Sequence, residues 1–300
     1  MAPSAIIESV VAVTQADTLG PDIYQNAQAV FGGLLSAQAK SAASATVPPN
    51  FHTYSSHSSF IKPVTLNAGG RVFYHVERTA DGRAYTTRLV HATQGDKDNT
   101  CVYIAVISFQ SRDKSPHNAL NYGTPLPDLS GVSPDDIPEG LNQKMPAASA
   151  SPDGPFKQLD SDGEPFDWRP LRFALTNEPY TCRSHSFARS LPLSTTSAAV
   201  NLAALAYMSD QVLFSIAIYA NPDKVGERAK NVTMGATLSH NVSFHDPAVK
   251  VDEWMVVERE TSWGGGGRVL IHERIWDLKS GSLVMTCMQE ALIRLRDSKI

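Results

Sequence analysis

The chain has 300 residues and a mass of 32.5 kDa, which favours two domains or one large domain. Hydrophobic residues make up 42% of it and charged residues 19%, a composition that excludes an intrinsically disordered chain. The net charge of -4 and the pI near 6.1 exclude the broad basic surface of a dedicated nucleic-acid-binding protein. No apolar run approaches the roughly 18 residues that a membrane span needs. We therefore expect neither a nucleic-acid partner nor a membrane segment.

The N-terminus and the cysteines indicate the compartment. The first residues contain Glu8 and Asp17 and lack a basic lead, so we expect no secretory signal. The three cysteines, Cys101, Cys182 and Cys287, are odd in number and show no metal-ligand spacing. This usage is typical of a reducing compartment.

The first 110 residues predict one helix followed by strands. Gly32-Gly33 opens an alanine-rich stretch, Leu34 to Ala45, which reads as a helix with small residues all round. Segments rich in Val, Ile, Tyr, Phe and Thr follow and predict strands near 51–62, 71–79, 84–94 and 101–110.

Residues 111–165 differ from the rest of the chain. They hold nine of the nineteen prolines, and nine acidic residues against four basic ones. Because proline removes backbone donors, this stretch predicts neither a helix nor a central strand. A loop of this length is unusual inside one compact domain. We interpret it as a linker between an N-terminal domain of residues 1–110 and a C-terminal domain of residues 166–300.

The second half repeats the pattern of the first. A helix rich in Ala and Leu is predicted from Ser194-Thr195 to about Met208, with strands near 212–220, 236–246, 253–260, 267–277 and 283–296. Two units of one helix and several antiparallel strands indicate an internal structural repeat of the α+β class. A helix with so little polar surface must be covered, and a curved sheet is the simplest cover.

The last predicted strand carries an unusual polar residue. At period two, one face of this strand holds Leu283, Met285, Cys287, Gln289, Ala291 and Ile293. Gln289 is the polar exception in this row, and a buried amide left unpaired costs about 1–3 kcal/mol. Two interpretations stay open: a core glutamine bonded to the backbone, or an amide that orients water or substrate.

A glycine run follows Thr261-Ser262-Trp263 and precedes Arg268. The four glycines, Gly264 to Gly267, would let a ligand approach the backbone closely, but a flexible hairpin loop has the same composition. The chain has no nucleophile elbow, phosphate loop or His-Glu-x-x-His zinc helix. His240 and His245 are five residues apart on a predicted strand, hence on opposite faces, and make a poor metal pair. We expect no metal.

Short motifs in a fixed order over nearly the whole chain resemble those of the acyl-CoA thioesterase II family. The first half contains Val30-Phe31-Gly32-Gly33, His57-Ser58-Ser59-Phe60-Ile61-Lys62-Pro63, Asp81-Gly82-Arg83-Ala84-Tyr85-Thr86-Thr87-Arg88 and Ser108-Phe109-Gln110. The second half contains Ala206-Tyr207-Met208-Ser209-Asp210, Ser239-His240, Phe244-His245, Glu258 to Arg268 and Gln289-Glu290-Ala291-Leu292-Ile293-Arg294.

The resemblance implies a double hotdog fold, in which two antiparallel sheets each wrap a central helix and pair edge to edge. It also implies thioester hydrolysis by an Asp, a Thr or Ser, and a Gln that position and activate a water. Gln289 matches the Gln, and Ser262 falls at the hydroxyl, with Thr261 as the second choice. Ser239, before His240, stands where the family has an Asp. We expect Ser239, Ser262 and Gln289 to meet at the junction between the lobes.

The missing carboxylate leaves the reaction open, because general-base help is worth about 10²–10⁴ in rate. The leading hypothesis is an enzyme that hydrolyses an acyl-CoA, on a specialised substrate, to free acid and CoA. The alternatives are a non-hydrolytic enzyme that dehydrates, isomerises or cyclises a bound metabolite, and a non-catalytic binding protein.

The resemblance also suggests substrate-binding residues. Backbone amides near Gly33 and Leu34 are candidates for stabilising an oxyanion, and Arg88 and Arg268 for meeting the phosphates of CoA. His57 and His240 belong to matched motifs and complete the expected set. CoA is expected only as part of the substrate, with no separate cofactor, and a homo-oligomer is allowed.

The last three residues resemble a targeting signal. Ser298-Lys299-Ile300 differs by one conservative change from the peroxisomal signal Ser-Lys-Leu. The sequence therefore predicts a peroxisomal protein, with the cytosol as the alternative.

Overall fold

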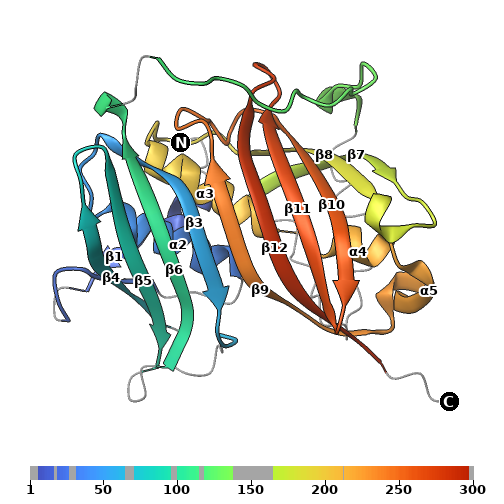
Figure 1. Ribbon diagram of the computed structural model, residues 1–300, viewed down its shortest axis with the longest axis horizontal. Coiled ribbons are helices and arrows are strands. Elements are labelled where there is room, and N and C mark those ends of the chain that lie inside the picture. Colours follow the sequence, from blue (N-terminus) through green and yellow to red (C-terminus); the bar gives the residue numbers. More distant parts are fainter. Residues whose placement is uncertain are drawn as a thin grey trace.

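A computed structural model describes residues 6–16, 19–26, 32–64, 71–95, 100–114, 118–137, 165–211 and 213–296 of the protein. Within these residues the strands form one antiparallel sheet of twelve, in the order β1-β2-β4-β5-β6-β3-β9-β12-β11-β10-β8-β7 (Figure 1). The first half of the chain supplies α1 (Ile6–Val11), β1 (Thr14–Gln15), β2 (Ile23–Asn26), α2 (Gly32–Ser44), β3 (Phe51–Phe60), β4 (Val72–Asp81), β5 (Tyr85–Gln94) and β6 (Thr100–Ser111).

The second half supplies the other six strands. They are β7 (Phe166–Ala174), β8 (Arg183–Ser190), β9 (Val232–Phe244), β10 (Met255–Gly265), β11 (Arg268–Asp277) and β12 (Leu283–Leu295). The helices of this half are α3 (Ala198–Asp210), α4 (Ser215–Tyr219) and α5 (Pro222–Val225). Single turns of 3-10 helix occur at Arg112–Lys114, Pro134–Asp136, Pro179–Thr181 and Glu227–Ala229.

The two halves join through β3 and β9, which pair antiparallel from Ser55 opposite Ser243 to Ser59 opposite Ser239. This pairing confirms the expected edge-to-edge union of two hotdog sheets. It also covers two strand edges that would otherwise expose unpaired backbone groups.

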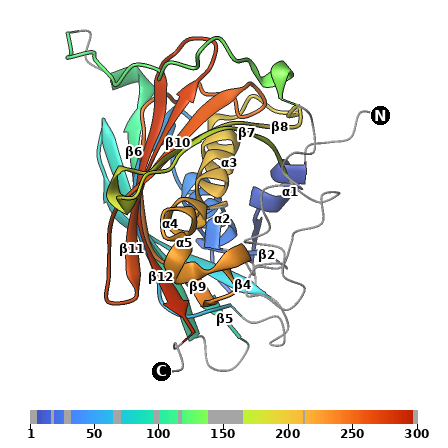
Figure 2. The ribbon, with the colours of Figure 1, turned by 90° about the vertical axis from the view of Figure 1, so that its right-hand side faces the viewer.

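The two alanine-rich helices lie side by side within the concave face of the sheet (Figure 2). Their alanines, such as Ala37 and Ala39 in α2 and Ala203 and Ala204 in α3, are fully buried, and such small side chains let the two backbones approach closely. One hydrophobic core includes residues of both helices and both halves of the sheet. The apolar composition of Ala198–Tyr219 would by itself suit a membrane span, but 82% of its most apolar window is buried inside the protein.

One predicted element is wrong, and others were missed. Residues 215–219, inside the strand predicted near 212–220, form the short helix α4 instead. The apolar run there is too short for its periodicity to distinguish a buried strand from a buried helix. The strands β7 and β8 were not predicted, because Pro170 and the serines and arginines of β8 obscure their alternation.

The linker is packed against the sheet where it is described. Residues 118–137 cross the upper ends of β12, β11 and β10 in Figure 1, where Leu126, Leu129 and Val132 pack against a cluster that includes Trp276. The indole nitrogen Nε1 of Trp276 donates to the carbonyl of Thr124 at 2.9 Å. Because β6 ends at Ser111 and β7 begins at Phe166, this segment lies between the two sheet halves in the chain and covers one of them.

Candidate active site

Gln289 lies on the concave face of β12, as its place in an apolar row predicts. Its residue is 1% exposed, and neither atom of its amide group has a hydrogen-bond partner within the described residues. On the same face, burial raises the pKa of the Cys287 thiol well above its usual range, and the Gln289 side chain acts in the opposite direction. An amide buried without partners favours the interpretation that Gln289 orients water or substrate.

A buried carboxylate stands at the end of α3. The Oγ1 atom of Thr237 donates to Oδ1 of Asp210 at 2.9 Å, and the backbone N–H of Gly33 also donates to the Asp210 carboxylate. The carboxylate lies so close to the first turn of α2 that a Cβ at Gly32 would come within 2.8 Å of Oδ2 of Asp210. Glycine is therefore required there by close approach, and the positive N-terminal end of α2 faces the acid.

The surroundings of Asp210 bring the pKa of its carboxyl group close to neutral pH. Burial raises the pKa of Asp210 to about 7, while the hydrogen bonds from Thr237 and Gly33 and the charge of Arg259 act in the opposite direction. A carboxyl group with a pKa near the working pH has the strength that a general base needs.

A β-bulge brings Thr237 to the same face as Gln289. On β12, Gln289 is opposite His240 and Ala291 is opposite Thr237, so Leu238 is an extra residue in β9. The side chains of Thr237 and His240 therefore both face inward, although the residues are three apart. Diagonal neighbours of this kind lie about 7–8 Å apart, a gap that a water or the reacting group of a substrate can span. Thr237, which bonds to Asp210, and Gln289 thus lie on the same face of the sheet beside the β3–β9 junction.

His240 belongs to a buried hydrogen-bond chain instead. The Lys40 ammonium donates to Oγ of Ser36 at 2.8 Å, Ser36 Oγ lies 3.1 Å from Nδ1 of His240, and His240 Nε2 lies 2.8 Å from Oγ of Ser209. Ser209 donates to the carbonyl of Ala206 at 2.9 Å, so its oxygen accepts from Nε2–H and Nδ1 accepts from Ser36. Burial and the nearby Lys40 hold the pKa of His240 well below its usual range.

These hydrogen bonds contradict the expectation that His240 binds substrate. The imidazole is neutral, fully buried, and uses both nitrogens to tie α2 and α3 to β9.

The structure does not bring Ser239, Ser262 and Gln289 together. Ser239 lies on the convex face, where its Oγ accepts weakly from the backbone N–H of Glu290 at 3.4 Å. Ser262 is exposed, and its Oγ lies 2.9 Å from Nε2 of His272, also on the convex face. The expectation was wrong because successive side chains of a strand alternate between faces and bulges shift that alternation, here at Leu238 and at Ser262.

Thr261 lies on the concave face, but its hydroxyl already has a hydrogen-bond partner. Its hydroxyl donates to the carbonyl of Leu270 at 3.1 Å, and Ile271 lies between it and Gln289 in the cross-strand row. Two strand spacings separate the backbones of Thr261 and Gln289 by about 9.6 Å. Thr261 therefore does not belong with the amide of Gln289.

Of the other expected substrate-binding residues, Gly33 and Leu34 lie at the start of α2. The N–H of Gly33 is bonded to Asp210, so it supports the carboxylate and is not free for an oxyanion. His57 is exposed on the convex face, with Nδ1 3.3 Å from Oδ1 of Asn241.

Neither arginine is placed in the site. Arg88 is 1% exposed and bonds to Thr46 and Asp81 within the N-terminal half, so it cannot meet phosphates. Arg268 is exposed, pairs with Glu290 at 3.0 Å and lies over the ring of Trp263. The glycine run closes the β10–β11 hairpin, where Gly266 and Gly267 adopt φ angles of 59° and 76° that favour glycine. The hairpin interpretation therefore holds for this loop.

Within the described part of the chain, no cluster of three or more His, Cys, Asp or Glu side chains could hold a metal ion.

Two substitutions on the convex face test this placement. We expect Ser239→Asp and Ser262→Ala each to leave kcat/KM for acyl-CoA hydrolysis within about twofold of the unmodified protein, because surface changes away from a site have small effects. Steady-state assays of released thiol measure this. A large gain in kcat/KM for Ser239→Asp, or a large loss for Ser262→Ala, would mean that hydrolysis takes place on the convex face.

Comparison with known proteins matches both halves of the chain to one family. A sequence model of the acyl-CoA thioesterase N-terminal domain matches residues 21–110, and one of the acyl-CoA thioesterase C-terminal domain matches residues 134–293. The chain belongs to the acyl-CoA thioesterase family. The resemblance seen in the motifs and the double hotdog fold are thereby confirmed, and the chain is a thioester hydrolase-like enzyme.

Relatives of this thioesterase match it over most of their length. Acyl-coenzyme A thioesterase 8 of Mus musculus is 27% identical, over 96% of this chain and 89% of its own. Peroxisomal acyl-coenzyme A thioester hydrolase 1 of Saccharomyces cerevisiae is 23% identical, over 88% of this chain and 85% of its own. The solved structure of an acyl-CoA thioesterase II from Mycobacterium marinum has a TM-score of 0.75 and 24% identity, over 97% of this chain and 99% of its own. The latter likeness shows the shared fold.

Sequence reasoning missed Asp210 and Thr237, although a signal for Asp210 was present. An acid at the C-terminal end of an apolar, buried helix is disfavoured by the helix dipole, so it needs a reason to be there. Thr237 had no such signal, because its inward direction depends on the bulge at Leu238.

Proposed function

We propose that this thioesterase hydrolyses acyl-CoA with Asp210 as the base, assisted by Thr237 and Gln289. One observation carries the proposal: the partly buried Asp210–Thr237 hydrogen bond of 2.9 Å lies on the same side of the sheet as a buried amide that has no partner in the described structure. This arrangement contains an acid, a hydroxyl and an amide, which is the combination that the family resemblance implies.

In this mechanism Asp210 accepts a proton from a water as the water oxygen attacks the thioester carbon. Gln289 Nε2–H donates to the oxygen that becomes negative, and Thr237 holds the carboxylate in place. The carbon–sulfur bond then breaks, and Asp210 returns its proton to the leaving sulfur of CoA. The products are the free acid and CoA, and the base is regenerated.

The serine at position 239 does not weaken this proposal. The general base that hydrolysis needs is supplied from α3 by Asp210, whereas Ser239 lies on the other face of the sheet. The alternatives of dehydration, isomerisation, cyclisation or simple binding rest on a missing carboxylate, and in this proposal Asp210 supplies the carboxylate.

The direct test is a panel of acyl-CoA thioesters of different chain length and polarity incubated with the purified protein. Mass spectrometry should detect equal amounts of free acid and CoA from at least one member. Activity in the presence of a chelator should be unchanged, because we propose no cofactor besides the CoA of the substrate. A modified acyl-CoA that keeps its thioester bond would instead support a non-hydrolytic reaction.

The pH dependence follows from the pKa of Asp210. Only the ionised carboxylate accepts a proton, so kcat/KM should rise with pH and level off above about 7, the pKa to which burial raises this group. Burial also raises the pKa of Glu273 to about 7, and Asp210 contributes to that shift. The rising limb of the pH–rate profile therefore reports the titration of both carboxyl groups together. Initial rates between pH 5 and 9 measure it. A limb centred near 4 would mean that the base is an exposed acid.

We propose a peroxisomal location for this enzyme. The support is the named peroxisomal relative from yeast. The residues that led to the expectation, Ser298-Lys299-Ile300, lie outside the described structure. A fluorescent protein fused to the N-terminus of the full chain should collect with a peroxisomal marker and disperse when these three residues are deleted. Diffuse fluorescence from the intact fusion would favour the cytosol.

A further inference from the structure

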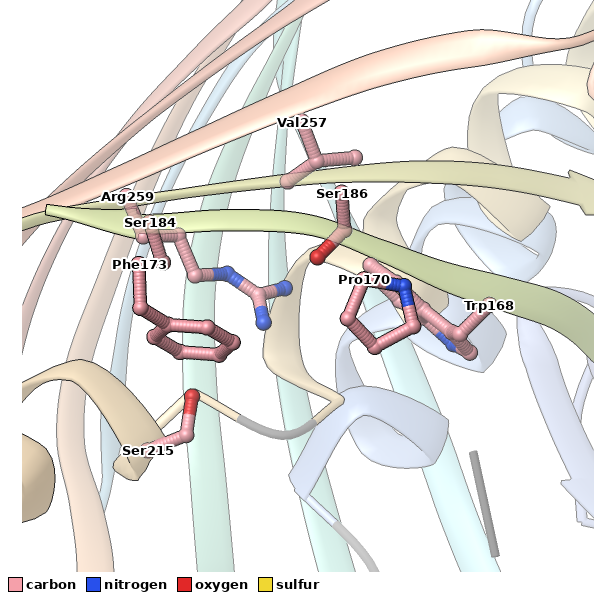
Figure 3. A pocket seen from close by; sticks show the side chains of 8 residues that line it. All are labelled: Trp168, Pro170, Phe173, Ser184, Ser186, Ser215, Val257 and Arg259. Carbon is pink, nitrogen blue, oxygen red and sulfur yellow. The ribbon is translucent and has the colours of Figure 1, made fainter. Parts of the chain in front are cut away.

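A small pocket lies on the concave face, between the strands β7, β8 and β10 and the start of α4. Its cavity volume is about 20 Å³, which is room for a water molecule or one small chemical group. The lining residues other than Arg259 are apolar or carry hydroxyls: Trp168, Pro170, Phe173, Val257, Ser184, Ser186 and Ser215. Figure 3 shows the guanidinium of Arg259 extending into the middle of this space, with the Ser186 and Ser215 hydroxyls turned toward it.

Arg259 is buried and incompletely paired. The residue is 4% exposed, and its Nε donates to Oε2 of Glu273, directly opposite on β11. Within the described residues, Nη2 of Arg259 and Oε1 of Glu273 are both buried without a hydrogen-bond partner. A buried donor and a buried acceptor left over on one ion pair require an explanation, because such groups are costly to desolvate.

The pocket lies on the same face of the sheet as the candidate active site. Arg259, Glu273 and Cys287 form one cross-strand row, and Cys287 is two residues from Gln289. Two strand spacings sideways and two residues along the strand place the backbones of Arg259 and Gln289 about 12 Å apart. Arg259 also acts electrostatically on Asp210. The indole of Trp168, which lines the pocket, donates at 3.1 Å to Gln211, the residue after Asp210.

The leftover atoms specify the chemistry of the ligand group. Nη2 of Arg259 needs an acceptor, and Oε1 of Glu273 needs a donor. A hydroxyl group supplies both, a carbonyl supplies only the acceptor, and a carboxylate would be repelled by Glu273. The phosphates of CoA do not fit, because the cation is already neutralised by Glu273 and the walls are largely apolar.

We propose that this pocket holds a hydroxyl group on the acyl chain of the substrate, so that the enzyme selects hydroxylated acyl thioesters. The inference rests on the proposed thioesterase function and specifies its substrate class. An unsubstituted alkyl chain would leave Nη2 without an acceptor and Oε1 without a donor. A site built around such bonds discriminates strongly against the analogue that lacks the hydroxyl.

The first measurement needs no variant. Octanoyl-CoA and decanoyl-CoA are compared with the same chains carrying a terminal hydroxyl, together with shorter and longer pairs that bracket the distance of about 12 Å. Assays at pH 8 keep Glu273 ionised. We expect kcat/KM to be at least about tenfold higher for the hydroxylated member of the pair that fits. No preference in any pair would overturn the proposal and leave a bridging water as the occupant of the pocket.

The second measurement removes both leftover groups. The double variant Arg259→Met/Glu273→Leu keeps the side-chain volume and replaces the ion pair by apolar groups, an exchange that buried ion pairs often tolerate. It should lose the preference for the hydroxyl, measured as the ratio of kcat/KM between the hydroxylated and the unsubstituted chain, because any change in the pKa of Asp210 on loss of Arg259 affects both substrates alike. The matched control is Arg183→Met/Glu260→Leu, an ion pair of 3.0 Å between β8 and β10 on the convex face. This control should keep the preference, and a double variant that keeps it too would overturn the proposal.

Binding of the free acids separates this proposal from the function on which it rests. Calorimetry compares octanoic with 8-hydroxyoctanoic acid, and likewise the other chain lengths, on the full protein. Hydrolysis of the paired substrates without preference would refute the hydroxyl pocket, whereas the proposed thioesterase function would stand. Absence of hydrolysis, with tighter binding of a hydroxy acid that the Arg259→Met/Glu273→Leu variant loses, would refute the thioesterase and support the pocket.

Discussion

Replacing Asp210 by Asn should lower kcat for acyl-CoA hydrolysis by about 10²–10⁴, the contribution of a general base. The amide has nearly the shape of the carboxylate and keeps one oxygen for the Thr237 hydroxyl, which now lies 2.9 Å from Oδ1. It cannot take a proton from water. Its NH₂ group would meet the N–H of Gly33, a cost that is offset because no buried charge remains. We therefore expect the melting temperature to change by only a few degrees.

Two comparisons distinguish a base from a structural acid. The residual activity of Asp210→Asn should lose the pH limb near 7, whereas a structural role would lower the rate and leave the limb in place. Thr237→Val should lower kcat as well, and Thr261→Val, which changes an inward-facing threonine bonded to the backbone, should not. Full activity in Asp210→Asn, measured as thiol release at saturating substrate, would remove Asp210 from the mechanism.

The fold could be predicted from the sequence where the composition of a segment allows only one kind of packing. Helices such as Leu34 to Ala45, with alanine on every side, cannot form a polar surface, so a sheet had to cover them, and it does. Strands with mixed polarity gave no such constraint, and β7 with its internal Pro170 was missed. The sequence of α4 predicts a strand because a segment of five residues is too short to reveal a period.

The candidate site could be predicted only in part, because side-chain direction on a strand depends on register. Gln289 was found, since β12 alternates regularly around it. Ser239 and Ser262 were placed by motif, and both point away from the concave face, one beside the bulge at Leu238 and one at a bulge. A single inserted residue reverses the parity of every position on one side of it. The pairing of Asp210 with Thr237 joins residues 27 apart in the chain, and no local pattern reports it.

Gln289→Leu should abolish most activity without loss of stability. The amide is expected to donate to the oxygen that becomes negative during attack, and removal of one such donor costs about 10²–10³ in kcat. Because neither amide atom has a partner within the described residues, leucine replaces an unsatisfied polar group by an apolar one of similar size. The melting temperature should stay constant or rise by a few degrees, since unpaired buried groups cost about 1–3 kcal/mol.

The matched control is Gln38→Leu in α2. Gln38 is also 1% exposed, but its Nε2 donates to the carbonyl of Val10 at 2.8 Å and its Oε1 accepts from the Tyr74 hydroxyl at 2.7 Å. Leucine there would leave both partners unpaired in the core, so the melting temperature should fall by several degrees while kcat at a lower temperature is kept. The two buried glutamines should thus show opposite responses to the same substitution, because one completes the core and the other is held ready for a substrate. If Gln289→Leu instead unfolds the protein as readily as Gln38→Leu and its folded fraction retains full kcat, Gln289 is a core amide and takes no part in hydrolysis.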